Sequence, residues 1–210
     1  YAIESTGIIE IAKQIARDNG LENKIIFLKS TAQKAVLPEK IDCIISEGMG
    51  VFGLQENMLP AIASIRNRYL KSNGIILPKK ISLYVALVNS NRIYNKTIGK
   101  WKKPFYGLNY SFYGNCNARD THCISVKTSD LGSNSVNILD LNIEKAILKK
   151  EYCLKASLIA NKNSVYYGFT GWFAAELVKD FVLNTSPFKP QTHWQQLFFP
   201  FKKPIKLKKN

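Results

Sequence analysis

Hydrophobic and polar residues follow different patterns in the first and second parts of the chain. In the first part, short apolar runs alternate with segments whose apolar residues recur every three or four positions, as in amphipathic helices. We expect strands at 24–30 and 41–47, the latter buried, and helices at 5–20 and 58–69, followed by the strands "GIILP" and "ISLYVALV". This alternation predicts a doubly wound α/β domain, a parallel sheet covered by helices, over residues 1–89.

The pattern changes after residue 89, where helical periodicity gives way to polar, Asn-rich and aromatic sequence. The runs "CISVKTS", "YCLKASLIA" and "VYYGFTGWFAAELV" alternate in the way that is typical of antiparallel strands. We therefore expect an all-β domain over residues 90–210, so that the fold class is α/β plus all-β. Residues 95–135 are the least regular part and are a candidate inserted arm.

Composition narrows the class of protein. The chain has 210 residues, of which 46% are hydrophobic, which is enough to bury a core. It holds no run of about 18–20 apolar residues, so we expect no membrane span and a cytoplasmic or nuclear location. Thirty Lys and Arg against fifteen Asp and Glu give a formal charge of +15. Because the basic residues are scattered, a nucleic-acid partner is possible but not favoured.

The four cysteines give no sign of a metal site or a disulfide framework. Cys43, Cys116, Cys123 and Cys153 form no CxxC pair and no cluster with histidine at metal-ligand spacing. We expect reduced thiols and no metal, with Cys43 buried in the strand at 41–47.

Polar residues lie where the predicted strands of the first domain end. Glu4 closes the run "YAIE", and Gln33 and Glu47 follow later strands. Since ligands of doubly wound sheets bind beyond the carboxyl ends of the strands, we expect these residues along one edge. Glu4 suits the two hydroxyls of a ribose; the alternative, an exposed glutamate at the start of a helix, stays open.

The segment "SEGMGVFGLQENM", residues 46–58, is a stronger signal. It places Glu47 at the end of a strand and Glu56 at the start of a helix, with three glycines between them. Two converging carboxylates can hold a metal, share a proton or bind a planar cation. A guanidinium fits best, because its forked donors match carboxylates in pairs. Two unrelated glutamates remain the alternative.

A third signal lies near the carboxyl terminus, in "TSPFKPQTHWQQLFF". His193 and Trp194 follow two prolines and precede an apolar run, which places both rings on a constrained turn. A lone histidine in a β domain is more often structural than catalytic. The adjacent indole favours a functional role, because an indole face is the best aromatic surface for a guanidinium.

Taken together, "YAIE", "SEGMGVFGLQENML" and "TSPFKPQTHWQQ", in this order, resemble the protein arginine methyltransferases. The resemblance implies a partial Rossmann-like domain that binds S-adenosylmethionine, followed by a partial β-barrel with an inserted dimerisation arm. It implies transfer of a methyl group to arginine in a protein substrate. The implied cofactor-binding residues are Glu4, Ala32, Gln33, Glu47 and Met58. The implied substrate-binding residues are Glu47, Met49, Glu56 and Trp194, and the implied catalytic residues are Glu47, Glu56 and His193.

The resemblance also implies a head-to-tail homodimer formed through residues 95–135. The glycine-rich first cofactor loop of the family has no counterpart in the sequence, so we expect a fragment of a longer protein. Two other functions stay open. One is a methyltransferase for a nucleic acid or a small molecule, suggested by the charge of +15. The other is a catalytically inactive dimerisation or binding module, suggested by Gly48, Val51 and Gln55 where the family often has other residues.

Overall fold

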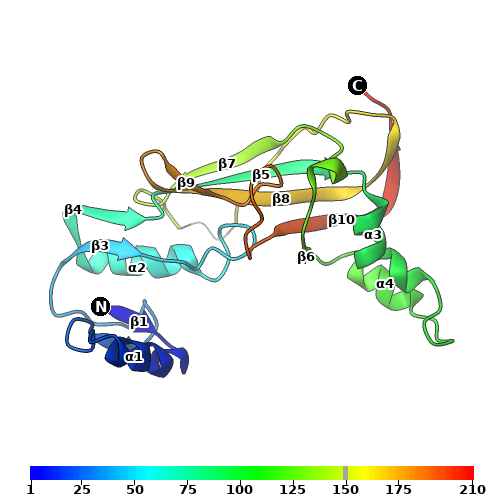
Figure 1. Cartoon of the computed structure of the whole chain (residues 1–210). Coiled ribbons are helices and arrows are strands. Elements are labelled where there is room, and N and C mark those ends of the chain that lie inside the picture. The colour runs from blue at the N-terminus through cyan, green and yellow to red at the C-terminus, as the bar shows by residue number, and fades with distance from the viewer. Residues whose placement is uncertain (149–150) are drawn as a thin grey trace.

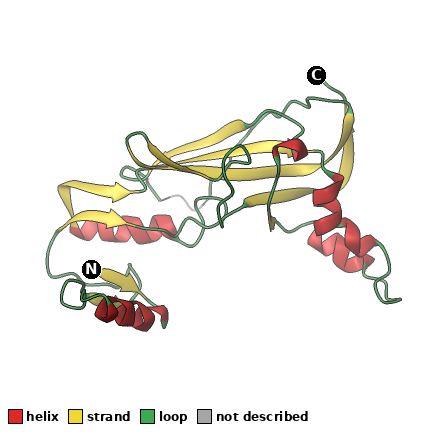
Figure 2. Ribbon diagram, viewed as in Figure 1, coloured by secondary structure: helices red, strands yellow, loops and turns green. Residues whose placement is uncertain are grey.

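The computed structural model describes residues 1–148 and 151–210. The molecule is elongated, with small α/β units at the amino-terminal end, a long twisted sheet in the middle and short helices at the opposite end (Figure 1). Strands make up most of the middle part, and the helices lie at the two ends (Figure 2). Among the described residues, no helix has the length and apolar character needed to cross a membrane.

The amino-terminal part confirms the predicted alternation of strands and helices. Its elements are β1 (Ala2–Glu4), α1 (Ile8–Asp18), β2 (Phe27–Lys29), β3 (Ile41–Ile45), α2 (Met58–Tyr69) and β4 (Leu70–Leu77). β1 pairs with β2 and β3 pairs with β4, both in parallel. α1 begins three residues later than expected and ends before Gly20, whose φ of 65° is readily adopted only by glycine.

The prediction of one continuous parallel sheet is wrong. The two parallel pairs share no ladder, and a cleft of about 260 Å³ lies between them, bordered by Ile3 of β1 and Ile44 of β3. β3 is not buried, because one of its edges faces this cleft. Cys43 is exposed rather than buried, and Ile45 is 78% exposed.

The rest of the chain forms a six-stranded sheet with every pair antiparallel. The strand order is β6-β10-β8-β5-β7, and β9 pairs with β8. β5, which falls within the range expected for the first domain, is a central strand of this sheet. The elements are β5 (Lys80–Val88), α3 (Asn91–Thr97), η1 (Gly99–Lys102), α4 (Ser111–Asn117), β6 (His122–Ile124), η2 (Thr128–Asp130), β7 (Val136–Asn142), β8 (Ser164–Val178), β9 (Phe181–Asn184) and β10 (Gln196–Leu207).

The three strand predictions for this part have different outcomes. The run at 165–178 is confirmed as β8, the longest strand. "CISVKTS" is a strand only in its first residues, within β6, and then turns into η2. "YCLKASLIA" is not a strand: most of residues 152–160 are exposed and pair with no strand of the described chain. An alternating pattern cannot form a strand without a neighbouring ladder.

One hydrophobic core joins the α/β part to the sheet. Ile62 and Ile65 of α2 share it with Ile81 of β5 and Phe173 of β8, all of them at most 5% exposed. Burial of such side chains contributes about 1.5–3 kcal/mol each, which fixes α2 against the sheet. The apolar face of α1, unlike that of α2, is not buried. Its Ile8, Ile11 and Ile15 are about 60% exposed, although the sequence places them on one helical face.

Candidate functional site

The loop between β3 and α2 carries the two glutamates and folds back on itself. The Gln55 side-chain Oε1 accepts a hydrogen bond from the Phe52 backbone N–H at 2.9 Å, and the Gln55 N–H donates to the Met49 carbonyl at 3.4 Å. Gly50 has a φ of 57°, and a Cβ there would lie 2.7 Å from Gln55. The loop therefore requires glycine at this position.

The two ends of the loop lie next to each other. A Cβ on Gly48 would lie 3.4 Å from the Met58 Cβ, and Met49 and Met58 are both buried in the core. Glu47 and Glu56 are exposed, and Glu56 has a left-handed φ of 57°. Neither carboxylate has a hydrogen bond or ion pair with any residue that the structure describes. The folded loop thus brings Gly48 next to Met58, while the neighbouring Glu47 and Glu56 side chains are exposed.

Aromatic packing holds the loop against the sheet. The Phe52 ring lies edge-on to Phe199, with ring centroids 5.5 Å apart, and covers Gly171 of β8. A Cβ on Gly53 would lie 2.9 Å from the Phe173 Cβ, so the loop backbone lies directly on β8.

The loop before β10 contacts the same core from the other side. Trp194 packs against the cluster that contains Met49 and Met58, and its ring lies edge-on to Phe173 at 5.7 Å. The exposed His193 ring lies 3.8 Å from the Trp194 ring. The structure thus joins Met49, Met58 and Trp194 in one cluster and places His193 at its edge.

Of the five residues expected to bind the cofactor, one, Ala32, is among those that line the cleft. Glu4 ends β1, and its carboxylate accepts a hydrogen bond from the Thr6 backbone N–H at 2.6 Å, which holds the pKa of Glu4 below its usual value. Ala32 lines the cleft between the parallel pairs, whereas Gln33 is exposed on the turn after β2. Within the described chain, no contact joins Glu4 or Gln33 to Glu47.

The described residues offer no ready metal site. No group of three or more His, Cys, Asp or Glu side chains lies close enough together within residues 1–148 and 151–210 to hold an ion. The four cysteines are free thiols.

Arg68 near the end of α2 was missed by the sequence reasoning. Its guanidinium donates to the Ala32 carbonyl at 2.6 Å, the Ala35 carbonyl at 2.8 Å and the Ser64 carbonyl at 3.0 Å. It thereby fixes the turn that carries Ala32 and Gln33 to α2. No sequence signal could have identified its link to this turn, because Ala32 and Ala35 lie more than thirty residues before it.

Arg68→Ala is expected to lower the free energy of unfolding by about 1–3 kcal/mol, because it leaves part-buried carbonyls unpaired. Urea denaturation followed by circular dichroism measures the loss. Arg17→Ala is the matched control, since the Arg17 side chain is exposed and donates only to Gln14; its effect should stay within about 0.5 kcal/mol. Equal losses in the two variants would contradict the role assigned to Arg68.

Known sequences match this chain over most of its length. The family described as "Arginine methyltransferase oligomerization subdomain" matches residues 79–210. Protein arginine N-methyltransferase 6 of Xenopus laevis is 30% identical over 207 residues, covering 93% of this chain and 61% of the relative. Protein arginine N-methyltransferase 1 of Schizosaccharomyces pombe is 29% identical over 214 residues, covering 99% of this chain and 62% of the relative. The chain thus spans about three fifths of the length of these relatives.

Solved structures share the fold. The Trypanosoma brucei PRMT1 enzyme–prozyme heterotetrameric complex with AdoHcy superposes with a TM-score of 0.85 at 21% identity, covering 99% of this chain and 67% of that chain. Arabidopsis thaliana protein arginine methyltransferase 10 gives a TM-score of 0.80 at 22% identity, covering 100% of this chain and 69% of that chain. With the family match over residues 79–210, more than half of its length, the chain belongs to the protein arginine methyltransferase family.

Proposed function

We propose that the protein transfers a methyl group from S-adenosylmethionine to a terminal guanidino nitrogen of arginine in a protein substrate. The observation that carries this proposal is the loop between β3 and α2, whose adjacent ends bear Glu47 and Glu56 and which shares a core cluster with Trp194. Membership of the family supports the same reaction.

The chemistry of two of these residues suits the cofactor. The ionised Glu4 carboxylate at the end of β1 is an acceptor-only group, as two ribose hydroxyls require, and Ala32 lines the cleft. Glu4, Ala32, Gln33, Glu47 and Met58 would hold the cofactor. When bound, S-adenosylmethionine supplies an electrophilic methyl group.

The two glutamates make the substrate guanidinium a better nucleophile. A guanidinium is a poor nucleophile, because its charge is delocalised and its pKa exceeds about 12. Glu47 and Glu56 localise that charge on the nitrogens that they face, which makes the remaining nitrogen a better nucleophile. Fixing the orientation of this nitrogen lowers the activation free energy by on the order of several kcal/mol, as is known for positioned reactants. One of the glutamates, or His193, accepts the proton, and Trp194 and Met49 line the substrate side.

Methyl transfer to peptides tests the proposal. The full-length protein is incubated with labelled S-adenosylmethionine and an arginine-rich peptide. The matched lysine-rich peptide and RNA serve as controls. Label on the arginine peptide alone supports the proposal. Label on RNA would favour a nucleic-acid methyltransferase, and no label in the presence of bound cofactor would favour an inactive module.

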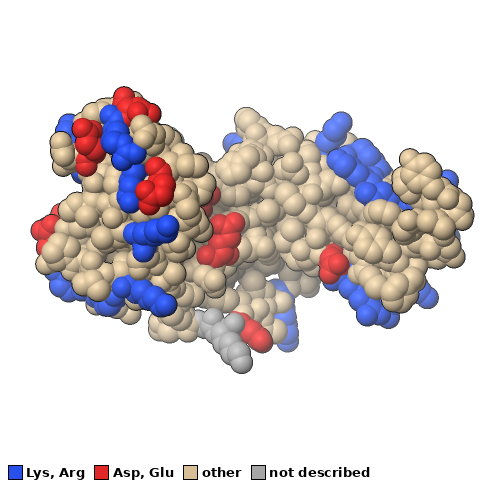
Figure 3. Space-filling model, turned by 90° about the horizontal axis from the view of Figure 1, so that it is seen from below, with Lys and Arg blue, Asp and Glu red and all other residues tan. Residues whose placement is uncertain are grey.

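The distribution of charge on one face of the molecule does not favour a nucleic-acid substrate. A surface that follows a phosphate backbone needs a continuous basic stripe. On the face seen in Figure 3, basic side chains lie in separate groups at the two ends of the molecule, and acidic side chains lie among or near them. Two glutamates at a substrate pocket would also repel an anion.

We further propose a homodimer formed head to tail through residues 95–135. Aromatic side chains of this arm are exposed, among them Tyr106 at 90% and Phe112 at 82%, and Ile8, Ile11 and Ile15 of α1 form a second exposed apolar surface. The arm helices and α1 lie at opposite ends of the molecule (Figure 1). Two copies arranged head to tail would cover both surfaces.

Phe112→Asp and Ile11→Asp are each expected to convert the dimer to a monomer, because each places a charge in a buried apolar contact. Sedimentation velocity at micromolar concentration measures the mass. Phe181→Asp is the control, since Phe181 is 64% exposed on β9 and outside both surfaces. A wild-type monomer, or dimers that persist in both arm and α1 variants, would refute this assembly.

A further inference from the structure

We propose that residues 122–130, here called the return segment because the arm comes back to the sheet there through β6, hold the loop at 186–195 in place, with Gln196 as the positioning residue. That loop carries His193 and Trp194. The effect on methyl transfer rests on the proposed function, whereas the effect on the loop itself does not.

Gln196 closes the base of the loop. It is the first residue of β10 and is 3% exposed. Its side-chain Oε1 accepts a hydrogen bond from the Val126 backbone N–H at 2.8 Å, and its Nε2 donates to the Thr185 carbonyl at 2.8 Å. Thr185 precedes the loop and Gln196 follows it, so one buried amide joins both ends of the loop to the return segment.

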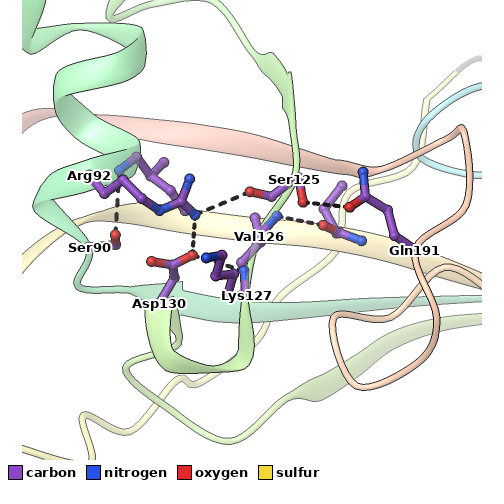
Figure 4. Close-up of polar contacts among 9 residues, drawn as sticks. Ser90, Arg92, Ser125, Val126, Lys127, Asp130 and Gln191 are labelled. Carbon is purple, nitrogen blue, oxygen red and sulfur yellow. Dashed lines mark hydrogen bonds and ion pairs between the residues drawn. The ribbon is translucent and has the colours of Figure 1, made fainter.

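The return segment contacts the loop at two further points. The Ser125 hydroxyl donates to the Gln191 side-chain oxygen at 3.0 Å, as Figure 4 shows. The Cys123 thiol lies 3.6 Å from the Trp194 carbonyl, and the Cys123 backbone is paired with β10. These contacts surround His193 without involving its ring.

The return segment is itself fixed to α3, the helix that leads into the arm. The buried Asp130 carboxylate accepts hydrogen bonds from the Arg92 guanidinium of α3 and from the Lys127 N–H, and Arg92 also donates to the Ser125 carbonyl at 3.3 Å (Figure 4). Burial would by itself raise the pKa of Asp130, but these hydrogen bonds hold it below its usual value. A connected set of polar contacts therefore runs from α3 to the loop.

The loop depends on these outside contacts because it has little internal structure. Its backbone hydrogen bonds are short-range turns, such as Gln195 N–H to Thr192 at 3.2 Å and Lys189 N–H to Ser186 at 3.0 Å. Removing the Gln196 amide leaves the Val126 N–H and the Thr185 carbonyl buried without partners, which is costly. The loop would then move away from its place beside Phe173.

Amide hydrogen exchange of Gln196→Met, which keeps the shape of the side chain without its hydrogen bonds, tests the inference. Exchange at 186–195 should increase about tenfold or more, while exchange in β5 and β8 stays unchanged. Gln196→Glu retains the acceptor for Val126 but places a buried carboxylate oxygen against the Thr185 carbonyl, so exchange at 186–195 should increase in this variant as well. Gln14→Met, on the exposed face of α1, should change nothing. Unchanged exchange in the loop, or an equal increase throughout the sheet, would overturn the inference.

Steady-state kinetics tests the functional consequence. Gln196→Met should raise KM for an arginine peptide several-fold and lower kcat, while KM for the cofactor stays at the wild-type value, because the contacts of Gln196 lie at the loop and not at the cleft. Wild-type kinetics in this variant would overturn the positioning role. If the wild-type protein transfers no methyl group while the exchange result holds, the proposed function fails and the structural inference stands.

Discussion

Glu47→Gln and Glu56→Gln are each expected to lower kcat for methyl transfer to an arginine peptide by about 100-fold or more. Glutamine has nearly the same shape as glutamate but carries no charge, so it cannot localise the charge of a guanidinium. Both side chains are exposed at adjacent ends of one loop and hydrogen-bond to no residue that the structure describes. The substitutions should therefore leave the fold and its free energy of unfolding nearly unchanged.

The kinetic pattern distinguishes this role from a structural one. In Glu56→Gln the dissociation constant for S-adenosylmethionine, measured by calorimetry, should change little, because Glu56 is not among the residues proposed to hold the cofactor. Glu22→Gln is the control, since it removes one exposed carboxylate beyond α1 and should keep the wild-type kcat. If both loop variants retain turnover, the two glutamates do not hold the substrate.

The sequence predicted individual helices and strands better than it predicted which elements pair or pack together. The amphipathic pattern of 58–69 and the alternation of 165–178 identified α2 and β8, because each pattern extends over several turns or pleats. The cleft between the two parallel pairs could not be predicted, since strand pairing depends on segments distant in sequence. The exposure of Ile11 has the same origin: a helix shows an apolar face whether or not another element covers it.

The residues of the candidate site likewise fall into those that short segments of sequence reveal and those that depend on distant contacts. Glu47, Glu56 and the His193–Trp194 pair could be proposed from the sequence because unusual residues stand close together in short segments. Arg68 and Gln196 were missed, because each acts through side-chain contacts with residues 11–70 positions away. Neither residue type is rare, so nothing in the sequence distinguishes them from exposed polar residues.

Gly53→Ala is expected to lower the free energy of unfolding by about 2–5 kcal/mol, combining backbone strain with overpacking. Gly53 has a φ of 77°, which costs an L residue about 1–2 kcal/mol. A Cβ there would also lie 2.9 Å from the Phe173 Cβ and 3.0 Å from the Leu83 Cδ2. These atoms belong to a fully packed core, so they cannot move aside at little cost.

Gly20→Ala separates the two contributions. Gly20 has a φ of 65°, and a Cβ there would have no heavy atom within 4 Å, so this variant measures backbone strain alone. Urea denaturation should show a larger loss of unfolding free energy for Gly53→Ala than for Gly20→Ala. The difference between the two losses reports how tightly the loop between β3 and α2 lies on β8. Because Phe173 also contacts Trp194, displacement of the loop should lower methyl transfer as well. Equal losses of unfolding free energy in the two variants would mean that the sheet does not fix the loop between β3 and α2. This loop and the loop before β10 would then move independently.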